Sequence, residues 1–585
     1  MSNRTYHRMP PILTFIVHLR RTVLTAGRPA PWLYRPSHRA AARRFFHAAS
    51  AVLVMAAAPG SYAQADHPPV PLYDNLGDYH YAITTRAPLA QRYFDQGLRL
   101  YYAFNHAEAI RAFNEGARLD PECAMCYWGI ALAHGPNINA PMDAAAGRAA
   151  YAAIRKALQL EAPVRERALI GALAARYAPL PPDGRAALDS AYALAMKQVV
   201  ELHPEDLEAR TLYAESLMDL SPWQYWNRDG SPREHTAELL GQLERVMSAN
   251  PSHPGANHFY IHAVEAVQPE RALAAAERLA NLMPGAGHLV HMPGHIYIRV
   301  GRYLDAIKAN EHAVHADETY IRDQRPAFGI YVAGYYPHNY DFLAFAASMI
   351  GRREQAIAAT EKIASLAPRE MLREPGMTFL QHHLTKHLQM KVRFGRWDEI
   401  LKAPPPPEDL PHARAMWHYA RGRALAAQGK LRRAATELAR VRATAKDSAV
   451  ASQRLEFNTS GALLGIAAEV LAGHLAAAEG DFSHATEHLR EAARQEDKLV
   501  YGEPPEWAVP VRQELGRVLL KAGLAAEAEQ AFRADLKRFP DNGWSLYGLA
   551  LALRARNSAS EAEAMMERFR KVWASADVQL TEAGH

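Results

Sequence analysis

Histidines gather in one part of this chain at spacings that suit metal coordination. Between His253 and His338, 86 residues carry nine of the 28 histidines, roughly twice their share. Neutral imidazoles are common ligands of transition metals, so this surplus suggests chemistry beyond packing. It is the strongest functional signal in the sequence, although it does not name a reaction.

The first group of candidate ligands is His258, His262 and Glu265. Residues three, four and seven apart share one face of an α-helix, so a single ion can contact all three. Two imidazoles and a carboxylate suit Zn²⁺, Fe²⁺ or Cu²⁺. Phe259 follows His258, so the H-E-x-x-H motif of zinc proteases and its general base are absent.

The second group is His288, His291 and His295, again at helical spacings of three and four. Pro293 and Gly294 lie inside it, and this pair breaks or starts a helix. We therefore expect a kink or a helix start near residue 292, flanked by His291 and His295. Stacking of repeats should bring this segment close to His258 and His262.

His338 follows a Tyr-Tyr-Pro turn and marks the next helix start. The full set of predicted metal ligands is His258, His262, Glu265, His291, His295 and His338. Candidate acid–base groups are Glu265, Tyr335 and Tyr336. Two other interpretations stay open: the polar groups fix a buried, hydrogen-bonded seam, or neutral imidazoles recognise a peptide carboxylate.

Three further features lie near this stretch in the sequence. His382, His383 and His387 form another helical group, which either lines the same groove or, as we expect, solvates an outer face. A loop at residues 501–507 combines carboxylates with aromatic rings and is a candidate for closing over a groove. The loop at residues 221–232 carries three aromatic residues that form either a plug or a substrate wall.

The elements that must position these side chains are repeating helix pairs. Residues 93–121 carry Gly97 and Tyr101 on a first helix, then Ala109 and Ala112 on a second, and end in a proline. This pattern resembles the tetratricopeptide repeat, in which small residues allow two antiparallel helices to touch. The resemblance extends over roughly residues 89–573 and implies an all-α fold, an α-solenoid of stacked antiparallel helix pairs. It also implies a groove for a peptide, a small molecule or a protein partner.

Turn signals support the repeats along the rest of the chain. Glycines expected to stop a first helix are Gly301, Gly351, Gly395, Gly429, Gly480 and Gly523. The 34 residues from Gly395 to Gly429 match the length of the resembled repeat. The predicted organisation is a leader at 1–65, an extended linker at 66–88, and repeats at 89–220, 221–400 (histidine-rich) and 401–585.

The first 65 residues resemble an export signal. They contain nine arginines and no acidic residue, with Arg43 and Arg44 before the apolar run 48–58 and a small-x-small site ending at Ala65. The signal fits either the general or the twin-arginine route, which predicts a periplasmic or secreted protein. The apolar run is too short to span a bilayer, and we expect no transmembrane helix in the mature chain.

Removing the leader reverses the sign of the charge. Residues 66–585 keep 58 basic residues, nine fewer than the whole chain, against 62 acidic ones, a net charge of −4. Nucleic acid is therefore not an expected partner. Tyr127 rather than His follows the Cys123 and Cys126 pair, which excludes c-type haem, and no Gly-rich phosphate loop is present. The two cysteines fit a local disulfide, apolar filling, metal ligation or thiol chemistry.

Two functions fit these observations. One is a metal-dependent enzyme, oxidative or hydrolytic, whose Zn, Cu or Fe ion keeps an open coordination position inside an exported helical-repeat protein. The other is a non-catalytic periplasmic scaffold that binds a peptide or an envelope protein. Methionines do not gather near the histidines, which disfavours a soft site for Cu(I) alone.

Overall fold

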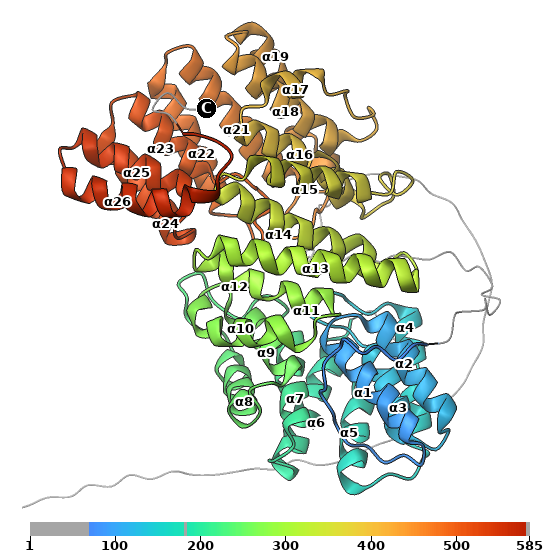
Figure 1. Cartoon of the computed structure of the whole chain (residues 1–585). Coiled ribbons are helices and arrows are strands. Elements are labelled where there is room, and N and C mark those ends of the chain that lie inside the picture. The colour runs from blue at the N-terminus through green and yellow to red at the C-terminus, as the bar shows by residue number, and fades with distance from the viewer. Residues whose placement is uncertain (1–69, 181–183, 581–585) are drawn as a thin grey trace, which may run out of the picture. The chain divides into compact units, whose positions relative to one another are not determined.

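The chain folds as helices that follow one another in antiparallel pairs, with each pair packed against the next (Figure 1). The computed structural model describes residues 70–180 and 184–580, so the predicted leader lies outside the described residues. Within those ranges there is no β-strand, only isolated bridges such as that between Asn137 and Ala140. The predicted all-α solenoid of stacked helix pairs is confirmed.

Four pairs precede the histidine-rich helices: α1 (Pro88–Tyr102) with α2 (His106–Leu119), α3 (Ala124–Ala133) with α4 (Ala144–Ala157), α5 (Val164–Ala174) with α6 (Ala186–Leu202), and α7 (Leu207–Asp219) with α8 (Thr236–Ala249). The histidine-rich part comprises α9 (Pro254–Val264) with α10 (Leu273–Leu282), α11 (Gly287–His291) and α12 (Pro293–Arg299) with α13 (Tyr303–Gln324), and α14 (Tyr336–Met349) with α15 (Arg353–Leu366).

The remaining pairs are α16 (Thr378–Arg393) with α17 (Trp397–Lys402), α18 (Pro411–Ala427) with α19 (Leu431–Lys446), α21 (Ser460–Ala478) with α22 (Phe482–Glu496), α23 (Val511–Lys521) with α24 (Ala525–Arg538), and α25 (Gly543–Ala555) with α26 (Ala559–Val572). Short elements are η1 (Pro269–Ala272), η2 (Tyr331–Tyr335), α20 (Ser448–Ala451) and η3 (Trp573–Ser575). Below, "first helices" means α1, α3, α5, α7, α9, α11, α12, α14, α16, α18, α21, α23 and α25.

Glycines set both the turns and the spacing of the pairs. All six glycines predicted to stop a first helix have left-handed backbone, with φ between 66° and 83°, a conformation that glycine adopts without strain. Glycine also makes room for large side chains between neighbouring first helices. A Cβ at Gly97 or Gly129 would lie 2.6 or 2.5 Å from Phe113, and a Cβ at Gly516 or Gly548 would similarly meet Phe532.

Residues 70–87, which precede α1, contain no helix and hydrogen-bond to later helices. The Tyr79 hydroxyl donates to Glu208 at 2.6 Å, and the Tyr81 hydroxyl donates to Asp206 at 2.8 Å. The Thr84 amide donates to Glu166 at 2.6 Å. This segment, predicted as an extended linker, is therefore attached to α5 and to the start of α7.

Within the described ranges one helix, α21, is long and apolar enough to span a membrane by length and composition alone. It packs against α18, α19 and α22, and residues such as Leu464, Ile466 and Leu471 are buried there. This packing accounts for its apolar composition.

The predicted break near residue 292 is confirmed, because α11 ends at His291 and α12 begins at Pro293. Two glycines let α13 approach these short helices closely. A Cβ on Gly287 would lie 1.9 Å from Asp317 Oδ1, and a Cβ on Gly294 would lie 2.7 Å from Asn310 Nδ2. The polar side chains of α13 therefore reach the histidine-bearing backbone.

We expect Gly287→Ala to lower the free energy of unfolding by about 2 kcal/mol, because the new methyl group must displace a buried carboxylate and α13 with it. Gly171→Ala is the matched control, since Gly171 is exposed on α5 and its Cβ would meet nothing within 4 Å. That variant should be unchanged or more stable by about 0.5 kcal/mol. Urea denaturation measures both; equal effects would contradict the close approach of α13.

Candidate metal centre

Three successive first-helix units bring six histidines into one continuous cluster. These are His258 and His262 on α9, His288 and His291 on α11, His295 on α12, and His338 on α14. Ring centroids of neighbours lie 5.0 Å apart for His258 and His288, and 5.3 Å apart for His262 and His295. All are buried except His338, which is partly exposed.

The first triad is His258, His262 and His288. One ring nitrogen of each lies within 4.8 Å of the other two, and the Nε2 atoms of His258 and His288 are 3.2 Å apart. His258 Nδ1 lies 2.7 Å from the Tyr102 carbonyl oxygen. Since a carbonyl can only accept, Nδ1 carries the proton and the lone pair of Nε2 faces into the triad.

The second triad is His291, His295 and His338, and one ring nitrogen of each again lies within 4.8 Å of the other two. The Nε2 atoms of His291 and His295 are 3.0 Å apart. His291 Nδ1 lies 3.2 Å from Asn310 Oδ1, and Asn310 Nδ2 donates to the Ala306 carbonyl at 2.8 Å. The amide is thereby oriented with its oxygen toward His291, so His291 donates from Nδ1 and turns its Nε2 lone pair inward.

These nitrogen separations fit a metal ion. A Zn–N bond of about 2.0–2.1 Å places two nitrogens of a tetrahedral site about 3.3 Å apart. The measured 3.2 and 3.0 Å are close to that value. Three imidazoles leave the fourth position of a tetrahedral ion open, as in catalytic zinc sites.

Glu265 links the two triads. Its Oε2 atom lies 3.0 Å from His295 Nδ1 and 3.5 Å from His262 Nδ1. Glu503 Oε2 also lies 3.2 Å from His295 Nδ1. His262, Glu265 and His295 lie close enough to hold an ion themselves, but a carboxylate at Nδ1 is the usual arrangement that orients a ligating histidine. The contacts therefore allow Glu265 to act either as the predicted ligand or as a group that orients His262 and His295.

His262 occupies the centre of the cluster without a hydrogen bond. It is 2% exposed, and neither of its ring nitrogens has a hydrogen-bond partner. A buried polar group left unpaired costs about 1–3 kcal/mol. A bound cation would satisfy one of these nitrogens, and the Glu265 carboxylate is placed to accept from the other.

The surroundings of the cluster shift the pKa values of its histidines. Burial, followed by the neighbouring imidazoles, lowers the pKa of His258, His262, His288 and His291 well below the usual range. Burial and then His295 lower the pKa of His338 to about 3. These five rings are therefore neutral at pH 7, the form that ligates metals. Burial also disfavours the charged form of His295, but Glu265 and then Glu503 raise its pKa to about 9.

Two aromatic side chains cover the first triad. The Phe104 ring centroid lies 4.6 Å from that of His258 and 5.2 Å from that of His288, and the Trp223 ring lies 5.0 Å from His262. Both residues have left-handed backbone, with φ of 53° and 63°, which costs about 1–2 kcal/mol per residue. Backbone strain of this kind gathers at functional sites. Of the aromatics in the 221–232 loop, Trp223 thus forms a wall of the histidine cluster.

The predicted acid–base candidates lie in different places. The Tyr335 ring is 4.6 Å from that of His288. The Tyr336 hydroxyl donates to Glu318 on α13 at 2.8 Å. Glu503 reaches the cluster from the 501–507 loop. The only sequence signal for this contact was the pairing of carboxylates and aromatics in that loop.

The expectation that His382 and His383 solvate an outer face is wrong. They are 3% and 5% exposed. His382 Nδ1 lies 3.2 Å from His412 Nε2, and His383 Nε2 lies 2.7 Å from Glu456. Their helix, α16, packs against α15 and α18 and carries these rings on a buried face. His387, also expected outside, is partly exposed.

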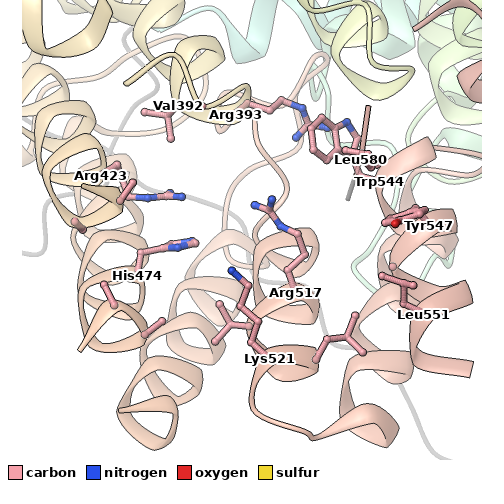
Figure 2. Close-up of a pocket in the computed structure, with 18 of the residues that line it drawn as sticks. Val392, Arg393, Arg423, His474, Arg517, Lys521, Trp544, Tyr547, Leu551 and Leu580 are labelled. Atoms are coloured by element: carbon pink, nitrogen blue, oxygen red, sulfur yellow. The ribbon is translucent and has the colours of Figure 1, made fainter. Parts of the chain in front are cut away.

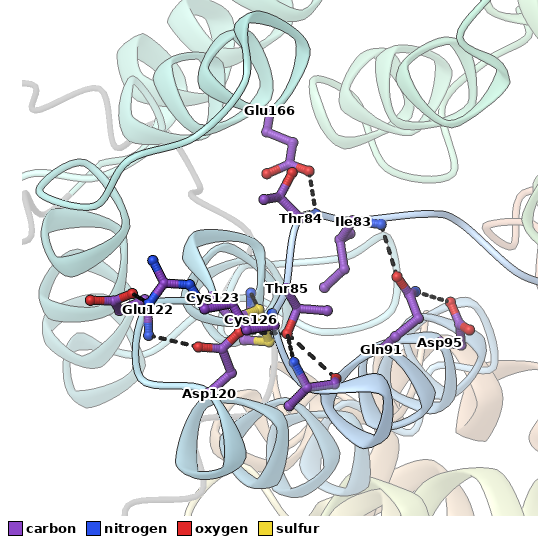
Figure 3. Close-up of a disulfide and its surroundings, with 12 residues drawn as sticks. Ile83, Thr84, Thr85, Gln91, Asp95, Asp120, Glu122, Cys123, Cys126 and Glu166 are labelled. Atoms are coloured by element: carbon purple, nitrogen blue, oxygen red, sulfur yellow. Dashed lines mark hydrogen bonds and ion pairs between the residues drawn. A yellow bond between two sulfur atoms is a disulfide. The ribbon is translucent and has the colours of Figure 1, made fainter.

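Cys123 and Cys126 form a disulfide at the start of α3 (Figure 3). Cys123 caps the helix, with its sulfur accepting from the Cys126 amide at 3.1 Å. Asp120 accepts from the Thr85 hydroxyl and the Arg86 amide beside it. Of the alternatives that the sequence left open, the structure has the local disulfide.

No protein-family model and no curated protein matches the chain. Among solved structures it is similar to the TPR domain of P58(IPK), at 12% identity over 81% of this chain and 99% of that chain, with a TM-score of 0.21. It is also similar to a human IFIT1 dimer with m7Gppp-AAAA, at 12% identity over 84% and 92% of the two chains, with a TM-score of 0.29. Because these scores are low, the fold assignment rests on the helix pairs of the chain itself.

The neutral histidines predict acid sensitivity. Their folded pKa values lie below the unfolded value of about 6.5, so unfolding takes up protons below that pH. Their contribution to stability is present above pH 6.5 and is lost as the pH falls, at about 1.4 kcal/mol per pH unit for each ring. His295 has the opposite sign: its contribution is present below pH 6.5 and is lost as the pH rises through about 9.

In protein freed of metal by a chelator, His288→Phe should therefore reduce the slope of the free energy of unfolding against pH. The expected reduction is about 1.4 kcal/mol per pH unit between pH 6 and 5. Urea titrations at each pH measure it. His484→Gln is the control, because Asp481 raises the pKa of exposed His484. An unchanged slope in His288→Phe would contradict a neutral buried ring.

Proposed function

We propose that this chain is an exported metalloprotein that binds two transition-metal ions, one in each histidine triad. The observation that carries the proposal is His262, which is buried without a hydrogen-bond partner for either ring nitrogen, belongs to the first triad and lies beside His295 of the second. The His258 and His291 tautomers, fixed from outside by Tyr102 and Asn310, supply inward lone pairs beside it.

The ligand set supports a metal-dependent enzyme. Imidazole nitrogens suit Zn, Cu or Fe, and a three-histidine ion with an open position activates water for hydrolysis or binds dioxygen for oxidation. The partly exposed His338 is the member of the cluster nearest to solvent and marks the side from which a substrate approaches. Tyr335, whose ring lies 4.6 Å from that of His288, is placed to hydrogen-bond a substrate near the first triad.

The alternative is a non-catalytic periplasmic scaffold that binds a peptide or an envelope protein. Only the stacked helix pairs support it, and such pairs serve many functions. A scaffold does not require unpaired buried imidazoles, so the metal proposal accounts for more of the structure.

Metal content tests the proposal directly. Wild-type protein supplied with Zn²⁺ should retain about two ions per chain after desalting, because each triad offers three imidazoles once Zn²⁺ displaces the extra proton of His295. His288→Ala and His338→Ala should each retain about one ion, since each variant damages a different triad. The double variant should retain none. Elemental analysis gives these ratios.

His312→Ala is the control, because His312 is exposed on α13, and it should keep the wild-type content. No bound metal in the wild-type protein would overturn the proposal and leave the scaffold. Loss of all metal in either single variant would show that one ion is shared by both triads.

Export is supported by the leader pattern and by the disulfide, which persists in oxidising compartments. We expect the mature protein from a bacterial periplasm to begin at Asp66, after the small-x-small site ending at Ala65. Intact-protein mass spectrometry measures this start. Replacing Arg43 and Arg44 by lysine should block export only if the twin-arginine route is used. A periplasmic mass that retains the leader would contradict cleavage.

A further inference from the structure

A second site lies away from the histidine cluster, in the later repeats. It is a cavity of about 820 Å³ (Figure 2), large enough for a small organic ligand. Five first helices, α16, α18, α21, α23 and α25, supply most of its lining. The metal centre is built on earlier first helices.

Basic side chains dominate the polar lining of this cavity. They are Arg393, Arg423, His474, Arg517, Lys521 and Arg554. None of the described residues that line it is Asp or Glu. Figure 2 shows Arg423 on α18, His474 on α21, and Arg517 and Lys521 on α23, directed into the same space.

One carboxylate behind the wall compensates only part of this charge. Glu514 forms a two-point ion pair with Arg423, at 3.0 and 3.2 Å, and lies 3.2 Å from His474. Its distance to Arg517 is 3.9 Å, without a hydrogen bond between them. The pairing of Glu514 with Arg423 therefore leaves the Arg517 guanidinium available to a ligand.

Arg393 is buried but forms no ion pair within the described part of the chain. It is 4% exposed, and its Nε has no hydrogen-bond partner. Its guanidinium lies 4.5 Å from the Trp544 ring centroid, and Nη2 contacts the Met349 sulfur at 3.6 Å. Among the described residues no carboxylate forms an ion pair with it. Burial, and then the charge of Arg517, lowers the pKa of Arg393 to about 9. A buried cation in this state needs an anionic partner.

The rest of the lining is apolar and aromatic. Trp397, Phe482, Trp544, Tyr547 and Leu551 all contribute. Aromatic and aliphatic walls around a few converging polar groups are typical of small-molecule sites. A ligand that fits both parts has an anionic head for the guanidiniums and an apolar body for these walls.

We propose that this cavity binds a small organic anion, a carboxylate or phosphate ester with an apolar body, whose charged group is held by Arg393 and Arg517. Planar guanidiniums match both head groups through paired hydrogen bonds. The proposal does not depend on the metal centre, since none of the six clustered histidines lines the cavity.

Calorimetric titration of the mature protein with 1-naphthyl phosphate, 1-naphthoate and 1-naphthol tests this proposal. The three probes share an apolar body and differ in the head. At least one anion should bind at least about tenfold more tightly than the neutral naphthol, and the stronger anion distinguishes phosphate from carboxylate. Equal affinities, or no heat from either anion at millimolar concentration, would overturn the proposal.

Arg393→Met keeps the length of the side chain and removes its charge. It should weaken anion binding at least about tenfold, while its melting temperature stays equal or rises because an unpaired buried charge is gone. Arg533→Met is the control, since Arg533 pairs with Glu529 on the surface and should not alter binding. If Arg393→Met fails to fold, the anion affinity of Arg517→Met is measured in its place. Unchanged anion affinity in the folded variant would reject the assignment.

Discussion

The central constraint in this protein is that six imidazoles are withdrawn from water in one place. Each ring has two nitrogens that need partners, and the surroundings supply partners mainly on the outer side. The Tyr102 carbonyl accepts from His258 Nδ1, and Asn310 Oδ1 accepts from His291 Nδ1. The Glu265 carboxylate lies near Nδ1 of both His262 and His295. The inner nitrogens are consequently turned toward one another, at 3.0 and 3.2 Å, distances that suit an ion held between them as well as a hydrogen bond.

Much of the local architecture serves this arrangement. His291 ends α11 and His295 lies on α12, and their Nε2 atoms are 3.0 Å apart across the break. Gly287 and Gly294 lack the Cβ atoms that would separate them from α13, and this brings Asn310 within reach of His291. Trp223 and Phe104 adopt left-handed backbone beside His262 and His258. The left-handed residues, the close approach of α13 and the break between α11 and α12 therefore all lie beside the histidine cluster.

Features governed by helical period could be predicted from the sequence. The spacing of His258 and His262, the break near residue 292 and the glycine stops are local, and the structure has each of them. Contacts from distant parts of the chain could not be predicted, because nothing local encodes them. The Tyr102 carbonyl lies 156 residues before His258, and Glu503 lies 208 residues after His295. His383 was misjudged for a related reason: a polar helix face resembles a solvated one until its buried partner, Glu456, is known.

The Glu503 contact has a consequence for the order of events during synthesis. The histidine ligands are all translated by residue 338, but the carboxylate that meets His295 belongs to a loop made 165 residues later. A nascent chain emerging from the ribosome therefore holds an incomplete pocket, in which the His295 ring has only Glu265 as its acidic neighbour. The finished environment forms only after residue 503 has been made and its loop has reached the earlier repeats.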